Sequence, residues 1–189
     1  SSTAPESDEP ISLEPTDDKF FEFHEGRYLG YYGDIDENEA EKYVDAYFVV
    51  MSEGMPEGVT AETYPRDIII PSEHEGKPVI GLAFSAGCTK AAVKRVVLPK
   101  TIRRVVYLRA SFPNLEKIYV EEGNEWLKVK HNCLIDNDGV LVAAGKNSFI
   151  PNDGSVTEIG EAAFIYCRDL KEINIPDSVR KLGEGAFAY

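Results

Sequence analysis

Residues 155–164 read SVTEIGEAAF, and residues 178–187 read SVRKLGEGAF. The two stretches carry Ser, Val, Gly, Glu, Ala and Phe at matching positions, with a constant offset of 23 residues. A period of this length is typical of repeat proteins, in which each repeat packs on the next and shares a core with it. The sequence therefore predicts a repeat solenoid, and it predicts that Phe164 lies directly over Phe187.

The same elements recur upstream, from Asp67 onward. Each predicted repeat has a leading strand, a second short strand and a helical turn that contains Ala-Phe. Most leading strands end in Pro, which cannot donate the next ladder hydrogen bond. We expect leading strands at 68–71, 96–99, 118–120, 148–151 and 173–176, and second strands at 79–81, 102–105, 156–159 and 179–182. The predicted fold class is β-rich with short helical turns.

Residues 121–147 interrupt the period. The segments 132–135 (NCLI) and 140–143 (VLVA) flank the sequence Asp136-Asn137-Asp138-Gly139, which is typical of a hairpin with an Asp-Gly turn. We expect this hairpin to project from the edge of the array. The same four residues resemble the start of a calcium loop, but Asn147 stands where a bidentate Glu is required. A plain turn is therefore the favoured interpretation.

The N-terminal third differs in composition from the repeats. Residues 1–18 are rich in Ser, Pro and acidic residues and predict a flexible leader. Residues 19–65 predict a small mixed α/β or β cap on the first repeat, and the repeats occupy 66–189. Within the cap, aromatic runs around Gly26 suggest a hairpin, followed by a helix from Glu37 to Val44 and a strand from Tyr47 to Met51.

Charge limits the classes of partner. The net charge is −13, with 17 acidic and 3 basic residues in 1–65 and a net charge of +1 in the remainder. Nucleic acid is not expected as a partner, because phosphate recognition needs clustered Lys and Arg. No run of 18 or more apolar residues exists, so we expect no membrane insertion of this chain.

Motifs for catalysis, cofactors and metals are absent from the sequence. The cysteines at 88, 133 and 167 have no CxxC spacing, and the histidines at 24, 74 and 131 have no i, i+4 partner. We interpret Cys88 and Cys167 as core thiols, and Trp126 as a packed side chain rather than a platform for a sugar ring. The sequence predicts no enzyme, no catalytic residue, no cofactor and no metal. A hydrolase built on the acidic N-terminal third stays the remote alternative.

Two stretches carry a family resemblance. Residues 70–79 (IPSEHEGKPV), followed by Ala83-Phe84, and residues 170–179 (LKEINIPDSV), followed by Leu182-Gly183, are similar to units of the BspA-like leucine-rich repeat surface protein family. The resemblance covers residues 66–189. It implies a right-handed leucine-rich-repeat coil and an extracellular location on a bacterial cell surface, with an anchor in a segment that precedes the chain.

For function, the resemblance implies a non-enzymatic module that adheres to a protein or glycan ligand. A second interpretation stays open, in which the chain is a structural spacer or a self-assembly unit that associates end to end. The truncated last repeat favours this second interpretation, because an uncapped repeat invites stacking.

Strand alternation predicts a contact surface. Equivalent outward positions of stacked strands align in columns about 4.7–4.9 Å apart. Exposed contiguous apolar side chains usually mark an interaction site. The central column is predicted to hold Ile69, Val97, Tyr119, Phe149 and Asn174, and its neighbour Asp67, Arg95, Lys117, Asn147 and Glu172. We take both columns, except Asp67 and Asn147, as candidate ligand-binding residues. Two alternatives stay open: the hairpin or the N-terminal third covers this face, or the predicted register is wrong.

Overall fold

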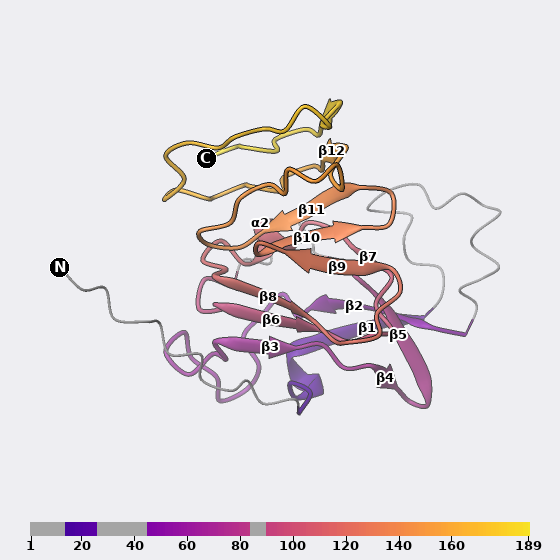
Figure 1. The fold of residues 1–189 in the computed structure, drawn as a ribbon. Helices are drawn as coiled ribbons and strands as arrows, with labels where there is room; N and C mark the ends of the chain where they lie inside the picture. Colours follow the sequence, from indigo (N-terminus) through magenta and orange to yellow (C-terminus); the bar gives the residue numbers. More distant parts are fainter. Residues whose placement is uncertain (1–13, 26–44, 84–89) are drawn as a thin grey trace.

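The computed structural model describes residues 14–25, 45–83 and 90–189, and within them the regular secondary structure is mainly β-strand (Figure 1). Two short helices accompany the strands in these ranges: the 3-10 helix η1 (Asp18–Phe20) and α2 (Leu108–Ser111). Neither helix has the length or the apolar character needed to cross a lipid bilayer. The strands are β1 (Phe21–Glu25), β2 (Tyr47–Met51), β3 (Asp67–Ile69), β4 (Glu73–His74), β5 (Lys77–Leu82), β6 (Arg95–Leu98), β7 (Arg104–Val105), β8 (Lys117–Val120), β9 (Leu127–Lys130), β10 (Cys133–Asp136), β11 (Val140–Ala144), β12 (Glu158–Ile159) and β13 (Lys181–Leu182).

The first three leading strands form one parallel sheet in the order β3-β6-β8. Ile68 pairs with Val96, and Val96 pairs with Ile118; all three are buried in the main core. Their neighbours along each strand therefore point to the opposite face, as alternation requires. The predicted register of these three strands is confirmed.

The second strands of the first two repeats, β5 and β7, lie in a separate sheet of order β1-β2-β5-β4, with β7 paired to β5. β2 and β7 both run parallel to β5, and β1 runs antiparallel to β2. The predicted strand at 47–51 is confirmed as β2. The hairpin predicted around Gly26, the helix predicted from Glu37 to Val44 and the leader up to residue 13 lie outside the described residues.

The N-terminal elements share the core of the first repeats. Phe20, Tyr47 and Tyr64 are buried in the same cluster as Ile68 and Val96. The chain also closes the free edge of β3, because the Thr16 N–H donates to the Ile69 carbonyl at 3.0 Å and the Thr16 hydroxyl accepts from the Ile69 N–H at 2.8 Å. The first rung therefore has hydrogen-bonding partners on both sides.

The predicted hairpin at 121–147 does not project from the edge. Its strands lie inside a third sheet, in the order β13-β12-β11-β10-β9, and β11 runs parallel to β12. The reason is that β10 is apolar on both faces. Leu134 belongs to the main core, whereas Cys133 and Ile135 belong to a second core that contains Phe164. A continuous apolar run of this kind is typical of a strand buried on both sides.

The last two repeats stack as the 23-residue offset predicts. The rings of Phe164 and Phe187 stack with centroids 5.1 Å apart at 19°. The recurring glycine has a steric cause, since a Cβ on Gly183 would lie 2.4 Å from the Glu161 nitrogen. Only glycine lets the two rungs approach so closely.

Leading strands are not formed at 148–151 or 173–176, so those two predictions are wrong. The outer edge of β8 is occupied instead by other groups. The Ile118 N–H donates to the Asn132 side chain at 3.1 Å, and the Lys146 N–H donates to the Glu116 carbonyl at 3.0 Å. Asn147, with φ 55°, then turns the chain away from the extended conformation.

Candidate functional site

The outward face of β3-β6-β8 carries the first three members of the predicted central column. Ile69 pairs with Val97, and Val97 pairs with Tyr119. Ile69 and Tyr119 are half-buried, but Val97 is only 8% exposed. Val97 lies between two larger neighbours in register, so the expectation that it is exposed is wrong. The surface that a partner could touch on this column is therefore formed by Ile69 and Tyr119.

The neighbouring column is charged. Arg95 donates from Nε to Asp67 Oδ1 at 2.6 Å and from Nη2 to Asp67 Oδ2 at 2.5 Å. This bidentate pair neutralises Arg95, which reduces its value as a contact for an acidic partner. Lys117 continues the column, is exposed, and has no ion-pair partner among the residues that the structure describes. Lys117 is thus the available cation of this face.

Asn132 extends the surface beyond β8. Its side-chain nitrogen donates to the Glu116 carbonyl at 2.6 Å and to the Lys146 carbonyl at 2.9 Å, while its oxygen accepts from the Ile118 N–H. Asn132 adopts a left-handed φ of 60°, which Asn tolerates better than most residues. The side chain thereby fastens the β9–β10 turn between β8 and the chain at 146.

The same turn brings an aromatic pair next to β8. The ring of His131 stacks on Phe149 at 3.9 Å and 24°, and Phe149 is 56% exposed. Phe149 is therefore near the sheet, as predicted, but as part of a loop and not as its fourth strand. Neither His131 nor Asn132 is predicted from the sequence to belong to this surface. A His-Asn pair before a strand is the signal that could have indicated a left-handed turn.

The remaining predicted residues do not join this face. Asn174 and Glu172 are exposed, and neither lies in a strand. The segment 172–176 forms no β-sheet hydrogen bonds with other described strands, so the column of aligned side chains does not extend to Asn174 or Glu172. Glu172 lines a cleft of about 480 Å³ instead.

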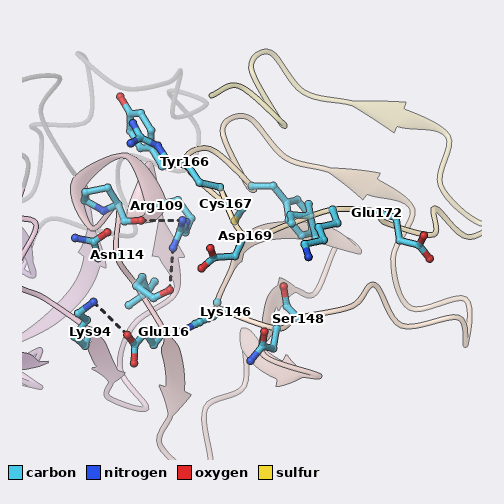
Figure 2. Close-up of a pocket in the computed structure, with 18 residues that line it drawn as sticks. Lys94, Arg109, Asn114, Glu116, Lys146, Ser148, Tyr166, Cys167, Asp169 and Glu172 are labelled. Carbon is cyan, nitrogen blue, oxygen red and sulfur yellow. Dashed lines mark hydrogen bonds and ion pairs between the residues drawn. The ribbon is translucent and has the colours of Figure 1, made fainter.

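That cleft lies between the loop that precedes β8 and the loop 166–172 (Figure 2). Its floor is formed by residues 145–148. Five cationic and three acidic side chains line it: Lys94, Arg109, Lys146, Arg168, Lys171, Glu116, Asp169 and Glu172. Lys94 pairs with Glu116 at 3.2 Å. The excess of positive charge is unexpected in a chain with a net charge of −13.

Arg109 lies at the inner end of this cleft and is only 3% exposed. Its guanidinium donates to the carbonyls of Leu115 at 2.9 Å, Pro113 at 3.0 Å and Ile165 at 3.1 Å. Figure 2 shows the first two of these bonds. Burial lowers the pKa of the guanidinium, and no carboxylate lies within 4.0 Å of it among the described residues. Among the described residues, Arg109 is a buried cation whose hydrogen-bond partners are neutral carbonyls.

The thiols are buried or half-buried. Cys133 is fully buried, and burial raises its pKa to about 12. Cys167 is half-buried and lines the cleft, and burial raises its pKa as well. Cys167 packs against the second core, as its interpretation as a core thiol requires, whereas Cys88 lies outside the described residues. Within the described ranges, no group of three His, Cys, Asp or Glu side chains could hold a metal ion.

Two sequence interpretations of the insertion agree with the structure. Asp136 accepts from the N–H groups of Asp138 and Val140, both at 2.9 Å, and Gly139 has φ 82°, so the Asp-Gly segment is a plain turn. Trp126 is half-buried against the main core, with the Arg103 guanidinium 4.6 Å from its ring centroid. The packed interpretation of Trp126 is confirmed.

Comparison with protein families identifies one region. Residues 145–189 match the family described as "BspA type Leucine rich repeat region (6 copies)". No curated protein matches the sequence. The resemblance stated from the sequence is therefore confirmed for the C-terminal repeats.

The chain also aligns with solved structures. The pneumococcal vaccine antigen PcpA aligns with a TM-score of 0.51 at 20% identity, over 61% of this chain and 30% of that one. A leucine rich cell surface protein from Faecalibacterium prausnitzii aligns with a TM-score of 0.46 at 22% identity, over 64% and 38%. A leucine-rich repeat protein from Eubacterium ventriosum aligns with a TM-score of 0.44 at 14% identity, over 76% and 58%. The chain spans less than two thirds of the length of each.

Proposed function

We propose that this chain, whose residues 145–189 are a BspA-type leucine-rich repeat region, is a non-enzymatic binding module of a bacterial cell surface. Its repeats coil as a right-handed solenoid, and the outward face of β3-β6-β8 contacts a protein or glycan ligand. The family match supports the repeat fold, and the likeness to a pneumococcal vaccine antigen supports the surface location.

The observation that carries the proposal is the row of accessible side chains beside β8. Tyr119 is half-buried and lies in register with Ile69 and Val97, and the exposed stack of His131 and Phe149 lies at the same edge. Aromatic side chains offer a large contact area at a low cost in conformational entropy. Lys117, exposed and without an ion-pair partner among the described residues, adds a charge next to them. This combination suits a ligand with an apolar or ring-shaped part and a polar rim.

An array of glycans and extracellular matrix proteins, probed with the purified chain, tests the proposal. A Tyr119→Ser/Phe149→Ser variant is expected to lose the signals that the unaltered chain gives, by about tenfold or more, because each truncation removes an aromatic contact worth about 1–2 kcal/mol. Met55→Ser is the matched control, since Met55 is 51% exposed and lies in none of the three sheets. Equal signals from a folded double variant would show that this face is not the site.

A second candidate function is self-assembly. β13 pairs with β12 on one side only among the described strands, and Leu182 on it is 54% exposed. Edge strands of this kind can pair with another chain. Sedimentation over a range of concentrations tests this function: it predicts oligomers that Leu182→Lys abolishes. A monomer at every concentration would contradict it.

A further inference from the structure

We propose that the cleft around Arg109 is a second ligand site, and that it binds an acidic sugar through the carboxylate. This site is separate from the face of β3-β6-β8 and does not depend on its function. Three features of the cleft support it: the buried cation, the charge balance, and the size and chemistry of the lining.

The first step is the electrostatic situation of Arg109. Its guanidinium has five N–H groups, and three of them donate to backbone carbonyls. Burying a charge is costly unless an opposite charge compensates it. No described side chain supplies that charge, so a carboxylate entering the cleft would meet a cation already stripped of water. Charge-assisted hydrogen bonds to such a group are about twice as strong as neutral ones.

The second step is the balance of the other charges. Lys146 and Lys171 are both exposed, line the cleft, and have no ion-pair partner among the described residues. Asp169 and Glu172 also line it without an ion-pair partner in the described ranges, and they oppose an anion. The cations remain in excess once Lys94 and Glu116 are set aside as a pair. The cleft is therefore positive within an acidic chain.

The third step concerns size and chemistry. A volume of about 480 Å³ is within the range typical of small-molecule sites. Among the apolar lining residues, Leu115 and Phe164 are each 2% exposed, whereas Pro113 and Leu170 are half-buried. The lining also includes the exposed amides of Asn114 and Asn147 and the half-buried ring of Tyr166, which stacks on Tyr189 with centroids 5.5 Å apart. Amides that bind hydroxyls, an aromatic ring and cations for a carboxylate together fit a uronic acid better than a peptide.

Isothermal titration with a digalacturonate tests the site, with its methyl ester as the neutral comparison. The acid is expected to bind, and the ester to bind at least about tenfold more weakly, because the ester carries no negative charge to pair with the cations of the cleft. Lys146→Gln and Lys171→Gln, which change exposed side chains, are each expected to weaken binding severalfold. Asp169→Asn removes a repelling charge and is expected to strengthen it. Lys128→Gln, an exposed lysine of β9 outside the cleft, is the control and should bind as the unaltered chain does.

Arg109→Gln tests the central residue, and circular dichroism shows whether the variant is folded. If it unfolds the protein, the Asp169→Asn and Lys146→Gln variants still decide the question. Equal affinity for acid and ester, or effects of Lys128→Gln as large as those of Lys146→Gln, would overturn the proposal. Tighter binding of an Asp-Glu dipeptide than of digalacturonate would overturn the assignment to a sugar. Failure of the Tyr119→Ser/Phe149→Ser experiment would leave these results unaffected.

Discussion

Replacement of Asn132 by Ala is expected to destabilise the fold strongly. The substitution removes the three side-chain hydrogen bonds to Ile118, Glu116 and Lys146. Each bond contributes about 0.5–1.5 kcal/mol net. Ala also tolerates the left-handed φ of 60° poorly, at about 1–2 kcal/mol. The expected loss of unfolding free energy is about 3–4 kcal/mol. This value is below the middle of the summed range, because the Glu116 carbonyl still accepts a hydrogen bond from the Lys146 N–H in the variant.

Two further variants separate these contributions. Asn132→Gly loses the same hydrogen bonds but accepts the left-handed conformation, so it should be more stable than Asn132→Ala by about 1 kcal/mol. Gly145→Ala acts on the same side chain, because a Cβ on Gly145 would lie 2.2 Å from the Asn132 side-chain nitrogen. We expect Gly145→Ala to be costly in the unaltered protein and nearly neutral beside Asn132→Gly, where that side chain is absent.

Urea denaturation followed by circular dichroism measures all four proteins of this double-mutant cycle. A coupling energy of at least about 1 kcal/mol between positions 132 and 145 is the expected result. Additive effects, or an Asn132→Ala variant that loses less than about 1 kcal/mol, would refute the view that this side chain fastens the turn to β8.

Three other predictions concern the two cores. Phe164→Ala should cost about 3–5 kcal/mol, and Phe187→Ala clearly less in the same urea experiment, because Phe164 is 2% and Phe187 39% exposed. Leu134→Ala and Ile135→Ala should each lower the free energy of unfolding by about 2–5 kcal/mol, and each variant should unfold in a single transition. Two separate transitions would contradict the view that β10 joins the two cores into one cooperative unit. At pH 8, iodoacetamide should not alkylate Cys133 in the folded protein but should alkylate it in urea, and peptide mass spectrometry detects the difference. Burial raises the pKa of Cys133 to about 12 from 9.0, so its contribution to stability is complete below pH 9 and declines between pH 9 and 12.

Those parts of the fold that depend on periodicity could be predicted from the sequence. The offset of 23 residues predicted the stack of Phe164 on Phe187, and alternation predicted the register from Ile69 to Tyr119. Both properties follow from short-range geometry that repeats along the chain. The burial of Val97 escaped prediction, because it depends on the size of its two neighbours and not on its own direction.

The insertion could not be placed by the same reasoning. A hairpin with an Asp-Gly turn is recognisable from sequence, but its position depends on which surfaces it buries. Cys133 and Ile135 face one core and Leu134 the other, and this two-sided burial was readable as a continuous apolar run. The cleft had no sequence signal, because Arg109 and Lys171 come from different repeats and meet only when the chain is folded.

Both candidate sites lie where the repeat is interrupted, and the interruption explains why they exist. Identical rungs satisfy one another's backbone groups and leave few polar groups to a partner. At β8 the regular ladder stops, and Asn132 takes the place of a strand partner. The Asn132 contact places the neighbouring His131–Phe149 stack beside the sheet. Residues 145–148, which follow β11, line the cleft. The insertion thus supplies two local surfaces that a perfect stack of repeats would lack, which is why recognition is best sought there.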